Sequence, residues 1–184
     1  MNPDKIFVYS DPHYGADPKM FIGNTSRARF STGEEMNEFM VQAHNSVVGP
    51  EDHVYCLGDF ASKREDVERW APRLNGHKRL VGGNHDIWPS EFYRKHGFQK
   101  YYGVRVFEGI MIYFTHIPIA PWSHGKMIAN VHGHVHHNKP LVYDVANPDA
   151  EGFSLSRRYI NLSVEIINYR PVSLAQILAL AVRR

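Results

Sequence analysis

The sequence has 184 residues, of which 43% are hydrophobic and 22% charged, so we expect residues 1–184 to form a single folded domain. Its one cysteine excludes an intramolecular disulfide and a cysteine zinc site, and its longest apolar runs are far shorter than the ~20 residues of a membrane span. A net charge of +2 is too small to indicate nucleic-acid binding. Asp4 and Lys5 precede the first apolar run, which is not the pattern of a secretory signal, so a cytoplasmic protein is expected.

The first half of the chain alternates predicted strands and helices. Short apolar, β-branched or aromatic runs predict strands at Ile6–Tyr9, His53–Leu57 and Arg79–Val81. Helical periodicity predicts helices at Gly33–Val48 and Lys63–Leu74, between these strands. This order of elements is typical of a parallel sheet in a layered α/β fold.

Each of these helices begins with a predicted capping box. Thr32 is followed three residues later by Glu35, and Ser62 by Glu65, a spacing that lets side chain and backbone cap each other. Before the first helix, segment 12–31 has no periodicity. A long irregular segment in a compact domain is more often functional than idle, so we expect a functional loop there.

The second half of the chain predicts a different arrangement. Val104–Phe107 and Ile110–Phe114 flank a Glu-Gly pair, which predicts a β-hairpin. Further strands are expected at Ile128–Val131, Leu141–Val145 and Tyr159–Val164. A final helix begins at Ser173, with Gln176 completing a capping box. We therefore expect an α/β fold with a two-sheet β-sandwich core flanked by helices, parallel in its first half and mostly antiparallel in its second.

Polar clusters follow the predicted strands at the points where the strands end. These clusters are Asp11-Pro12-His13, Gly58-Asp59, Gly83-Asn84-His85-Asp86, Thr115-His116 and Gly133-His134-Val135-His136. Because the carboxyl ends of strands in open α/β sheets converge on one crevice, we expect the five clusters to form one site. Their carboxylate, amide and imidazole donors, in a chain with 12 histidines, suit Mn²⁺, Fe, Zn²⁺, Ni²⁺ or Co²⁺.

In this order and spacing, the five clusters resemble the motifs of the calcineurin-like metallophosphoesterase superfamily. They run from Asp11 to His136, about two-thirds of the chain. The stretches Arg29-Phe30-Ser31 and Asn161-Leu162-Ser163-Val164-Glu165 also resemble a small bacterial and phage-type subgroup of that superfamily. The resemblance implies the calcineurin-like metallophosphoesterase fold and the hydrolysis of a phosphoester.

The resemblance further implies a centre of two divalent metal ions, with manganese as the first choice. Asp59 would bridge the two ions, because a shared carboxylate offsets the repulsion between cations. The remaining ligands would be Asp11, His13 and His136 for the first ion and Asn84, His116 and His134 for the second. A metal-bridging hydroxide would then attack the phosphorus of the substrate.

Two further residues of the motif are implied to be catalytic. His85 would protonate the leaving group or stabilise the transition state, and Asp86 would orient its imidazole. Substrate contacts are expected from Arg29, Trp122 and His124, although a plain loop anchor explains the last two equally well. The nearby His132 continues the alternation of the histidine cluster but lies outside the motif, and we interpret it as structural or as lying behind the ligands.

Three functions are open at this point. A phosphodiesterase is favoured, because the chain is short and its sequence has neither a cap domain nor a cationic cluster that would bind a dianionic monoester. The nearest alternative is a phosphomonoesterase or nucleotidase, for which the substrate would be a nucleotide. The third is a non-catalytic metal-binding scaffold, and the presence of His85 argues against it.

Overall fold

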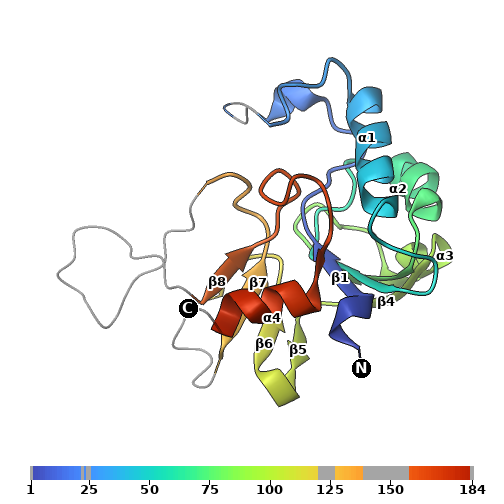
Figure 1. The fold of residues 1–184 in the computed structure, drawn as a ribbon. Coiled ribbons are helices and arrows are strands. Elements are labelled where there is room, and N and C mark those ends of the chain that lie inside the picture. Colours follow the sequence, from blue (N-terminus) through green and yellow to red (C-terminus); the bar gives the residue numbers. More distant parts are fainter. Residues whose placement is uncertain (1, 22, 24–25, 120–126, 139–157, 183–184) are drawn as a thin grey trace.

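The structure, a computed structural model, describes residues 2–21, 23, 26–119, 127–138 and 158–182. It contains two β-sheets, with the strand orders β4-β3-β2-β1-β9 and β5-β6-β7-β8. Figure 1 shows helices α1, α2 and α3 gathered on the side of the first sheet, with α4 lying across from them. This two-sheet core with flanking helices confirms the predicted fold class. No helix in the described part of the chain is long and apolar enough to cross a membrane.

The first sheet is built from the predicted alternation of strands and helices. Its strands are β1 (Ile6–Tyr9), β2 (His53–Cys56), β3 (His77–Val81), β4 (Phe98–Tyr102) and β9 (Val172–Ser173). The helices between them are α1 (Gly33–Asn45), α2 (Arg64–Trp70) and α3 (Ser90–Lys95). Strands β1 to β3 are parallel, as predicted, and β4 is parallel to β3, whereas β9 runs antiparallel to β1. The periodicity did not predict α3 and β4, which extend the sheet by one more unit.

The second sheet differs from its prediction in the direction of its strands. These strands are β5 (Arg105–Phe107), β6 (Ile112–Phe114), β7 (Ala129–His132) and β8 (Tyr159–Asn161). Strands β5 and β6 form the predicted antiparallel hairpin, but β6, β7 and β8 are parallel to one another. The expectation of mostly antiparallel strands is therefore wrong. Segments 115–128 and 133–158 are long enough to carry the chain back to the same end of the sheet, which a short turn cannot do.

Two of the three predicted capping boxes are confirmed. The hydroxyl of Thr32 accepts a hydrogen bond of 3.1 Å from the backbone N–H of Glu35 at the start of α1. At the start of α4 (Leu174–Val182), Ser173 and Gln176 cap each other with hydrogen bonds of 2.9 and 3.2 Å. Local sequence is sufficient for these helix starts because both partners lie within one turn.

The capping box predicted at Ser62 is wrong. Helix α2 begins only at Arg64 and has no side-chain cap. The backbone N–H of Ser62 instead donates to the carbonyl of Tyr14, 2.9 Å away, so a tertiary contact with the loop after β1 holds this segment extended. The predicted strand Leu141–Val145 lies outside the described residues.

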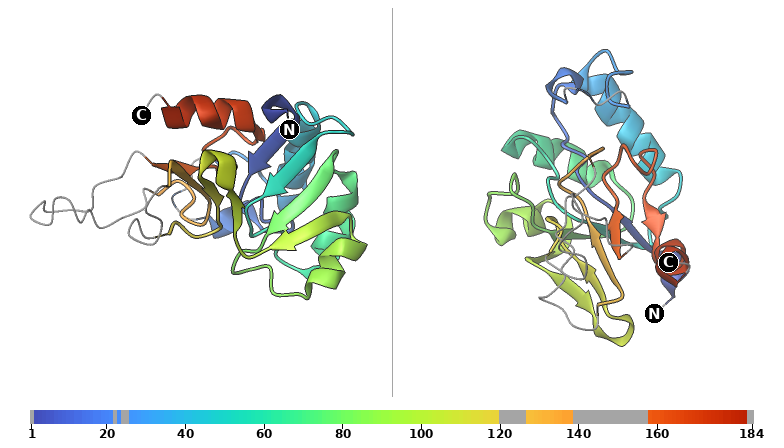
Figure 2. Two further views of the ribbon diagram at one scale, coloured as in Figure 1. Left: turned by 90° about the horizontal axis from the view of Figure 1, so that it is seen from below. Right: turned by 90° about the vertical axis from the view of Figure 1, so that its left-hand side faces the viewer.

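Side chains alternate between the two faces of each strand. Both faces of the first sheet are buried. On β1, Ile6 and Val8 pack into the core shared with the second sheet, whereas Phe7 and Tyr9 pack toward the helices. The molecule therefore has a helical layer, a first sheet and a second sheet, which Figure 2 shows from two sides. Helix α4 lies beside β1, β9 and the N-terminal turn.

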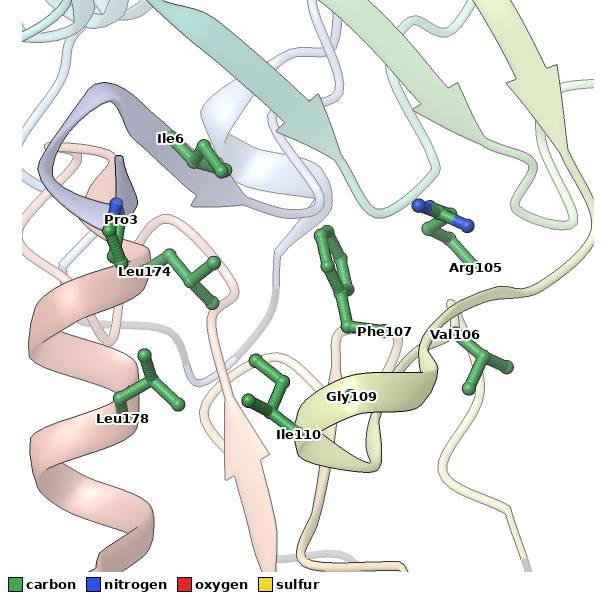
Figure 3. A pocket seen from close by; sticks show the side chains of 9 residues that line it. All are labelled: Pro3, Ile6, Arg105, Val106, Phe107, Gly109, Ile110, Leu174 and Leu178. Atoms are coloured by element: carbon green, nitrogen blue, oxygen red, sulfur yellow. The ribbon is translucent and has the colours of Figure 1, made fainter. Parts of the chain in front are cut away.

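An apolar groove of about 530 Å³ lies at the amino end of β1 (Figure 3). Its walls come from the N-terminal turn, from α4 and from the connection between β5 and β6, and they include Ile6, Leu174 and Leu178. Arg105 is the one charged side chain among the described lining residues, and its guanidinium lies over the ring of Phe107, 4.8 Å from the ring centroid. This groove is at the end of β1 opposite to the polar cluster that follows the strand.

Candidate metal centre

The predicted metal ligands emerge at the carboxyl ends of parallel strands. They follow β1, β2 and β3 in the first sheet and β6 and β7 in the second. In chain order these residues are Asp11, His13, Asp59, Asn84, His116, His134 and His136. Because β1, β2 and β3 are parallel to one another, as are β6 and β7, their loops reach the same edge of the sandwich (Figure 1). The parallel direction of β6 and β7, which the sequence did not predict, is what brings the last three residues to this edge.

Three overlapping sets of these side chains place their ligand atoms within 4.8 Å of one another. The sets are Asp11 with His13 and His136, His13 with Asp59 and His85, and Asp59 with His116 and His134. The amide Oδ1 of Asn84 lies 3.0 Å from Nε2 of His116 and so belongs beside the last set. We call Asp11, His13 and His136 the first ligand group, and Asn84, His116 and His134 the second ligand group. Asp59 lies between the two groups.

The backbone is strained at most of these positions. Eight non-glycine residues of the described chain have positive φ, and five of them belong to this set. The five are Asp11 (57°), His13 (49°), Asp59 (51°), His134 (69°) and His136 (52°). Left-handed backbone is unfavourable for residues with a Cβ and persists only where surrounding contacts enforce it. The concentration of such residues at one place indicates a functional site.

Hydrogen bonds and close packing around Asp11 hold its loop in this strained conformation. Its buried carboxylate accepts hydrogen bonds from the backbone N–H of His134 at 3.0 Å and from the hydroxyl of Ser163 at 2.9 Å. A Cβ at Gly133 would lie only 2.1 Å from Oδ2 of Asp11, so no other residue fits there. Loops from β1, β7 and β8 are thereby tied together through one carboxylate.

Electrostatics around Asp59 favour an ionised carboxylate in the middle of the centre. Burial by itself raises the pKa of Asp59, but the hydrogen bond and positive charge of His116 outweigh it and bring this pKa down to about 2. Nε2 of His116 lies 3.3 Å from Oδ2 of Asp59, and Nε2 of His13 lies 3.6 Å from the same oxygen. Burial lowers the pKa of His13 to about 3, so its ring is neutral at pH 7.

The donor atoms fit a divalent metal. Nε2 of His13 is buried and makes no hydrogen bond to the described residues, although buried polar atoms in folded proteins are normally paired. A neutral imidazole nitrogen beside the ionised carboxylate of Asp59 is a ligand pair of the kind that binds Mn²⁺, Fe or Zn²⁺. The His and Asp clusters therefore indicate a divalent metal centre.

His85 lies at the open side of this centre. Its side chain is 54% exposed, and its Nε2 lies 4.0 Å from Oδ2 of Asp59. Its backbone N–H donates to Oδ1 of Asp59 at 2.8 Å, which fixes the start of the side chain relative to the ligands. The ring stands edge-on to that of His13, with 5.1 Å between centroids.

Asp86 has different partners from those expected. Its buried carboxylate accepts hydrogen bonds from the backbone N–H groups of Asp59, Phe60 and Gly83 at 2.8, 3.1 and 2.8 Å. The expected role of orienting the His85 ring therefore needs correction, since the carboxylate oxygens are used by the loops after β2 and β3. Asp86 joins these two loops, and through them it places Asp59.

The remaining predicted residues fall in different parts of the molecule. The guanidinium of Arg29 lies over the rings of Phe39 and Tyr169, 4.4 and 4.9 Å from their centroids, which is a packing environment outside the ligand groups. Trp122 and His124 lie outside the described residues. His132 is fully buried, and its Nδ1 lies 2.9 Å from the carbonyl oxygen of Gly133, in agreement with a structural role behind the ligands.

Two residues to which the sequence analysis assigned no role lie directly behind the first ligand group. The side chain of Glu165 is 1% exposed; its Oε1 lies 2.6 Å from Nδ1 of His136, and its Oε2 accepts a hydrogen bond of 2.9 Å from the buried Arg27. Burial raises the pKa of Glu165, but the hydrogen bond with His136 and the charge of Arg27 bring it down to about 2. Glu165 directly follows the predicted strand Tyr159–Val164, so the rule that located the other clusters could have found it. Arg27 lies in the irregular segment 12–31, where no local signal marks it.

A pocket of about 400 Å³ opens beside these residues. It is lined by His13, Ala16, Met20, Phe21, Ser62, His85, His136, His137 and Asn138. Its described lining contains three of the site histidines but no lysine or arginine. Part of the irregular segment 12–31 forms one of its walls, which gives that segment a place next to the centre.

The fold and this centre define a class of protein, and comparison with known sequences agrees with it. Residues 4–167 match the calcineurin-like phosphoesterase family, and the chain belongs to this family. The resemblance seen in the sequence motifs is thereby confirmed. Family membership, together with the His and Asp clusters, supports a metal-dependent phosphoester hydrolase.

Individual proteins of other organisms are similar to this chain. It is 32% identical over 183 residues to an uncharacterized protein of Methanocaldococcus jannaschii, with 98% of this chain and 93% of the relative covered. A protein of unknown function from Aquifex aeolicus has a similar structure, with a TM-score of 0.69 and 25% identity over 95% of this chain and 98% of the other. A nuclease of Pseudomonas putida is more distant, with a TM-score of 0.49 and 22% identity over 72% of this chain and 62% of the nuclease.

Proposed function

We propose that this protein is a phosphodiesterase that uses two divalent metal ions, with Mn²⁺ as the first choice. The observation that carries the proposal is the position of Asp59, whose Oδ2 lies 3.6 Å from Nε2 of His13 in the first ligand group and 3.3 Å from Nε2 of His116 in the second. Two cations at ~3.5–4 Å from each other require a shared anion to offset their repulsion. A buried carboxylate between the two ligand groups suits that position.

One ion would be held by the first ligand group and the other by the second, with Asp59 shared. Bound there, the ions would act as Lewis acids toward the phosphoryl oxygens and would make water a better nucleophile at neutral pH. The strained loops of the protein contribute rigidity, because they hold the candidate ligand atoms of each set within 4.8 Å of one another. The buried carboxylates of Asp11 and Asp59 contribute the negative charge.

His85 is proposed to act on the substrate rather than on the ions. Its exposed ring stands at the mouth of the pocket beside Asp59 and His13, where the oxygen of a leaving group would pass. From there the imidazole can donate a proton to that oxygen or stabilise charge on the phosphoryl group. Asp86 supports this role indirectly, because it holds the loop that carries His85 against the loop that carries Asp59.

The preference for a diester rests on the charge and polarity of the pocket. A monoester is dianionic and gains from a fixed cation, whereas the described lining has no lysine or arginine, and the guanidinium of Arg27 is buried against Glu165. A diester carries one negative charge and a second organic group. The exposed Met20 and the neighbouring Phe21 offer an apolar wall for that group, which in a nucleotide substrate would be a nucleoside.

A pair of model substrates tests this proposal. We expect the purified protein with Mn²⁺ to hydrolyse bis(p-nitrophenyl) phosphate with a higher kcat/KM than p-nitrophenyl phosphate, and Asp59→Asn to lose both activities. A higher kcat/KM for the monoester would overturn the diester assignment in favour of a phosphomonoesterase or nucleotidase. Binding of two Mn²⁺ ions without turnover of either substrate, or of cyclic and linear nucleotides, would support the scaffold.

A further inference from the structure

We infer that Arg27 and Glu165 are positioning residues for the first ligand group, and that they make its metal affinity depend on a buried ion pair that the second ligand group does not use. The inference rests on the proposed two-metal function. It concerns two residues that lie outside the five ligand clusters, and none of the proposed steps involves them.

Glu165 acts on the group through His136. Its Oε1 lies 2.6 Å from Nδ1 of His136, which requires the ring proton on Nδ1 and leaves the Nε2 lone pair directed away from the carboxylate. A carboxylate in this position fixes the tautomer and orientation of a ligating histidine and makes its other nitrogen a better donor. Since the Glu165 side chain is almost fully buried, water does not compete for this hydrogen bond.

Arg27 acts on the same group through the backbone. Besides its bond to Glu165, the guanidinium donates to the carbonyl oxygen of Pro12 at 3.1 Å and to that of Asp11. These carbonyls belong to the loop in which Asp11 and His13 adopt positive φ. One buried cation therefore contacts the loop that carries two members of the first ligand group and, through Glu165, reaches the third.

The flat guanidinium is itself held in place. The ring of Phe21 lies against it, with 4.0 Å between the guanidinium carbon and the ring centroid. Arginine is suited to this position because its planar fork can serve several acceptors at once while stacking on an aromatic ring. Lysine has the same charge but cannot reproduce both features.

The second ligand group is supported differently. Nδ1 of His116 lies 2.9 Å from the backbone carbonyl oxygen of Leu57, a neutral acceptor at the end of β2. Nδ1 of His134 lies 3.1 Å from Nε2 of His116, so these two nitrogens face each other as candidate ligand atoms. Neither contact involves Arg27 or Glu165. Removing the charge of Glu165 should therefore weaken the binding of the ion at the first ligand group and leave the binding of the other ion unchanged.

Site-resolved metal titration tests this asymmetry. In the full chain, His116→Ala disables the second ligand group and His13→Ala the first, so each background reports mainly on the remaining site. We expect Glu165→Gln to raise the Kd for Mn²⁺ about 10- to 100-fold in the His116→Ala background, which is the usual cost of losing such a partner. In the His13→Ala background the Kd should not change. Calorimetric titration of metal-free protein with Mn²⁺ measures both constants.

Asp52→Asn is the matched control, because Asp52 is also a buried carboxylate paired with a cation, Lys5, at 3.0 Å, but lies at the amino end of β2. It should change neither Kd. Arg27→Lys should raise the Kd of the first site alone, and by a smaller factor than Glu165→Gln. Circular dichroism of the metal-free protein shows whether Glu165→Gln folds. If it does not, the change in Kd of Arg27→Lys tests the inference in its place.

Two results would overturn the inference: an unchanged Kd in the His116→Ala background, or an equal increase in both backgrounds. Failure of the proposed function is distinguishable from these outcomes. If the wild-type chain binds only one Mn²⁺, or none, the two-metal assignment is wrong whatever Glu165 does. If it binds two and the Glu165 variants behave as wild type, only the positioning role is wrong.

Discussion

The metal centre has a buried wall and an open wall. Four of its residues are at most 6% exposed: Asp11, His13, Asp59 and His116. Three others are exposed to solvent: Asn84, His85 and His134. The buried wall contains both carboxylates, whereas the open wall consists of an amide and two imidazoles, of which His85 lines the pocket. From this difference we expect a division of roles, in which the buried wall holds charge and His85 on the open wall meets substrate.

The largest expected effect comes from the middle of the buried wall. Asp59→Asn should reduce activity by about 10²- to 10⁴-fold, because removing one buried charge partner costs about 3–5 kcal/mol. It should also weaken the binding of both metal ions, since the amide replaces a shared anion. Metal analysis and kcat/KM measured on the same preparation check this. Wild-type turnover and metal content in the variant would show that Asp59 is only a structural residue.

The next effect concerns the open wall. His85→Ala should lower kcat by about 10²- to 10⁴-fold while metal content stays near wild type, because the ring supplies a proton or charge stabilisation without being needed as a ligand. The loss should be smaller for a diester with a nitrophenolate leaving group than for one with an alkyl leaving group, which needs the proton. An equal loss on both substrates would assign charge stabilisation, and no loss on either would favour the scaffold.

A third variant tests how the two walls are joined. Asp86→Asn should lower the free energy of unfolding by about 2–3 kcal/mol, because backbone N–H groups of Asp59, Phe60 and Gly83 lose a charged acceptor. Urea denaturation measures this change. Activity should fall equally for good and poor leaving groups. A leaving-group dependence like that of the His85 variant would instead mean that Asp86 orients the imidazole.

The smallest effect on activity is expected from a buried histidine of helix α1 that belongs to neither wall. Burial lowers the pKa of His44 in α1 to about 4, while its Nε2 lies 3.1 Å from the carbonyl oxygen of Asn75. The unfolded chain binds this proton below about pH 6.5 and the folded chain only below about pH 4, so acid favours unfolding in that window. Between pH 7 and pH 4 the contribution to stability should fall by up to about 3 kcal/mol.

Urea denaturation at several pH values, compared with that of His44→Gln, measures the contribution of this histidine. The variant should show a shallower dependence of stability on pH between 4 and 6.5, and unchanged kcat at pH 7. A slope equal to that of wild type would mean that His44 is protonated as easily in the folded protein as in the unfolded chain.

Much of the centre could be predicted because its information is local. Each ligand follows a strand, and a strand is recognised from a few consecutive residues, so Asp11, Asp59 and Asn84 were identifiable without any tertiary contact. That the loops converge followed from a general rule for α/β sheets. The helix starts at Thr32 and Ser173 were predictable for the same reason, since their capping partners lie three residues away.

Only the tertiary structure decided the interactions between distant segments. The direction of β7 and β8 depends on where long connections return, which no short pattern encodes. Asp86 bonds to the backbone of Asp59, 27 residues away, and Arg27 bonds to Glu165, 138 residues away. The sequence by itself determined which residues could bind metal, because ligand chemistry belongs to each side chain. Which polar groups support them was decided by packing, because a buried hydrogen bond goes to whichever partner the fold brings within reach.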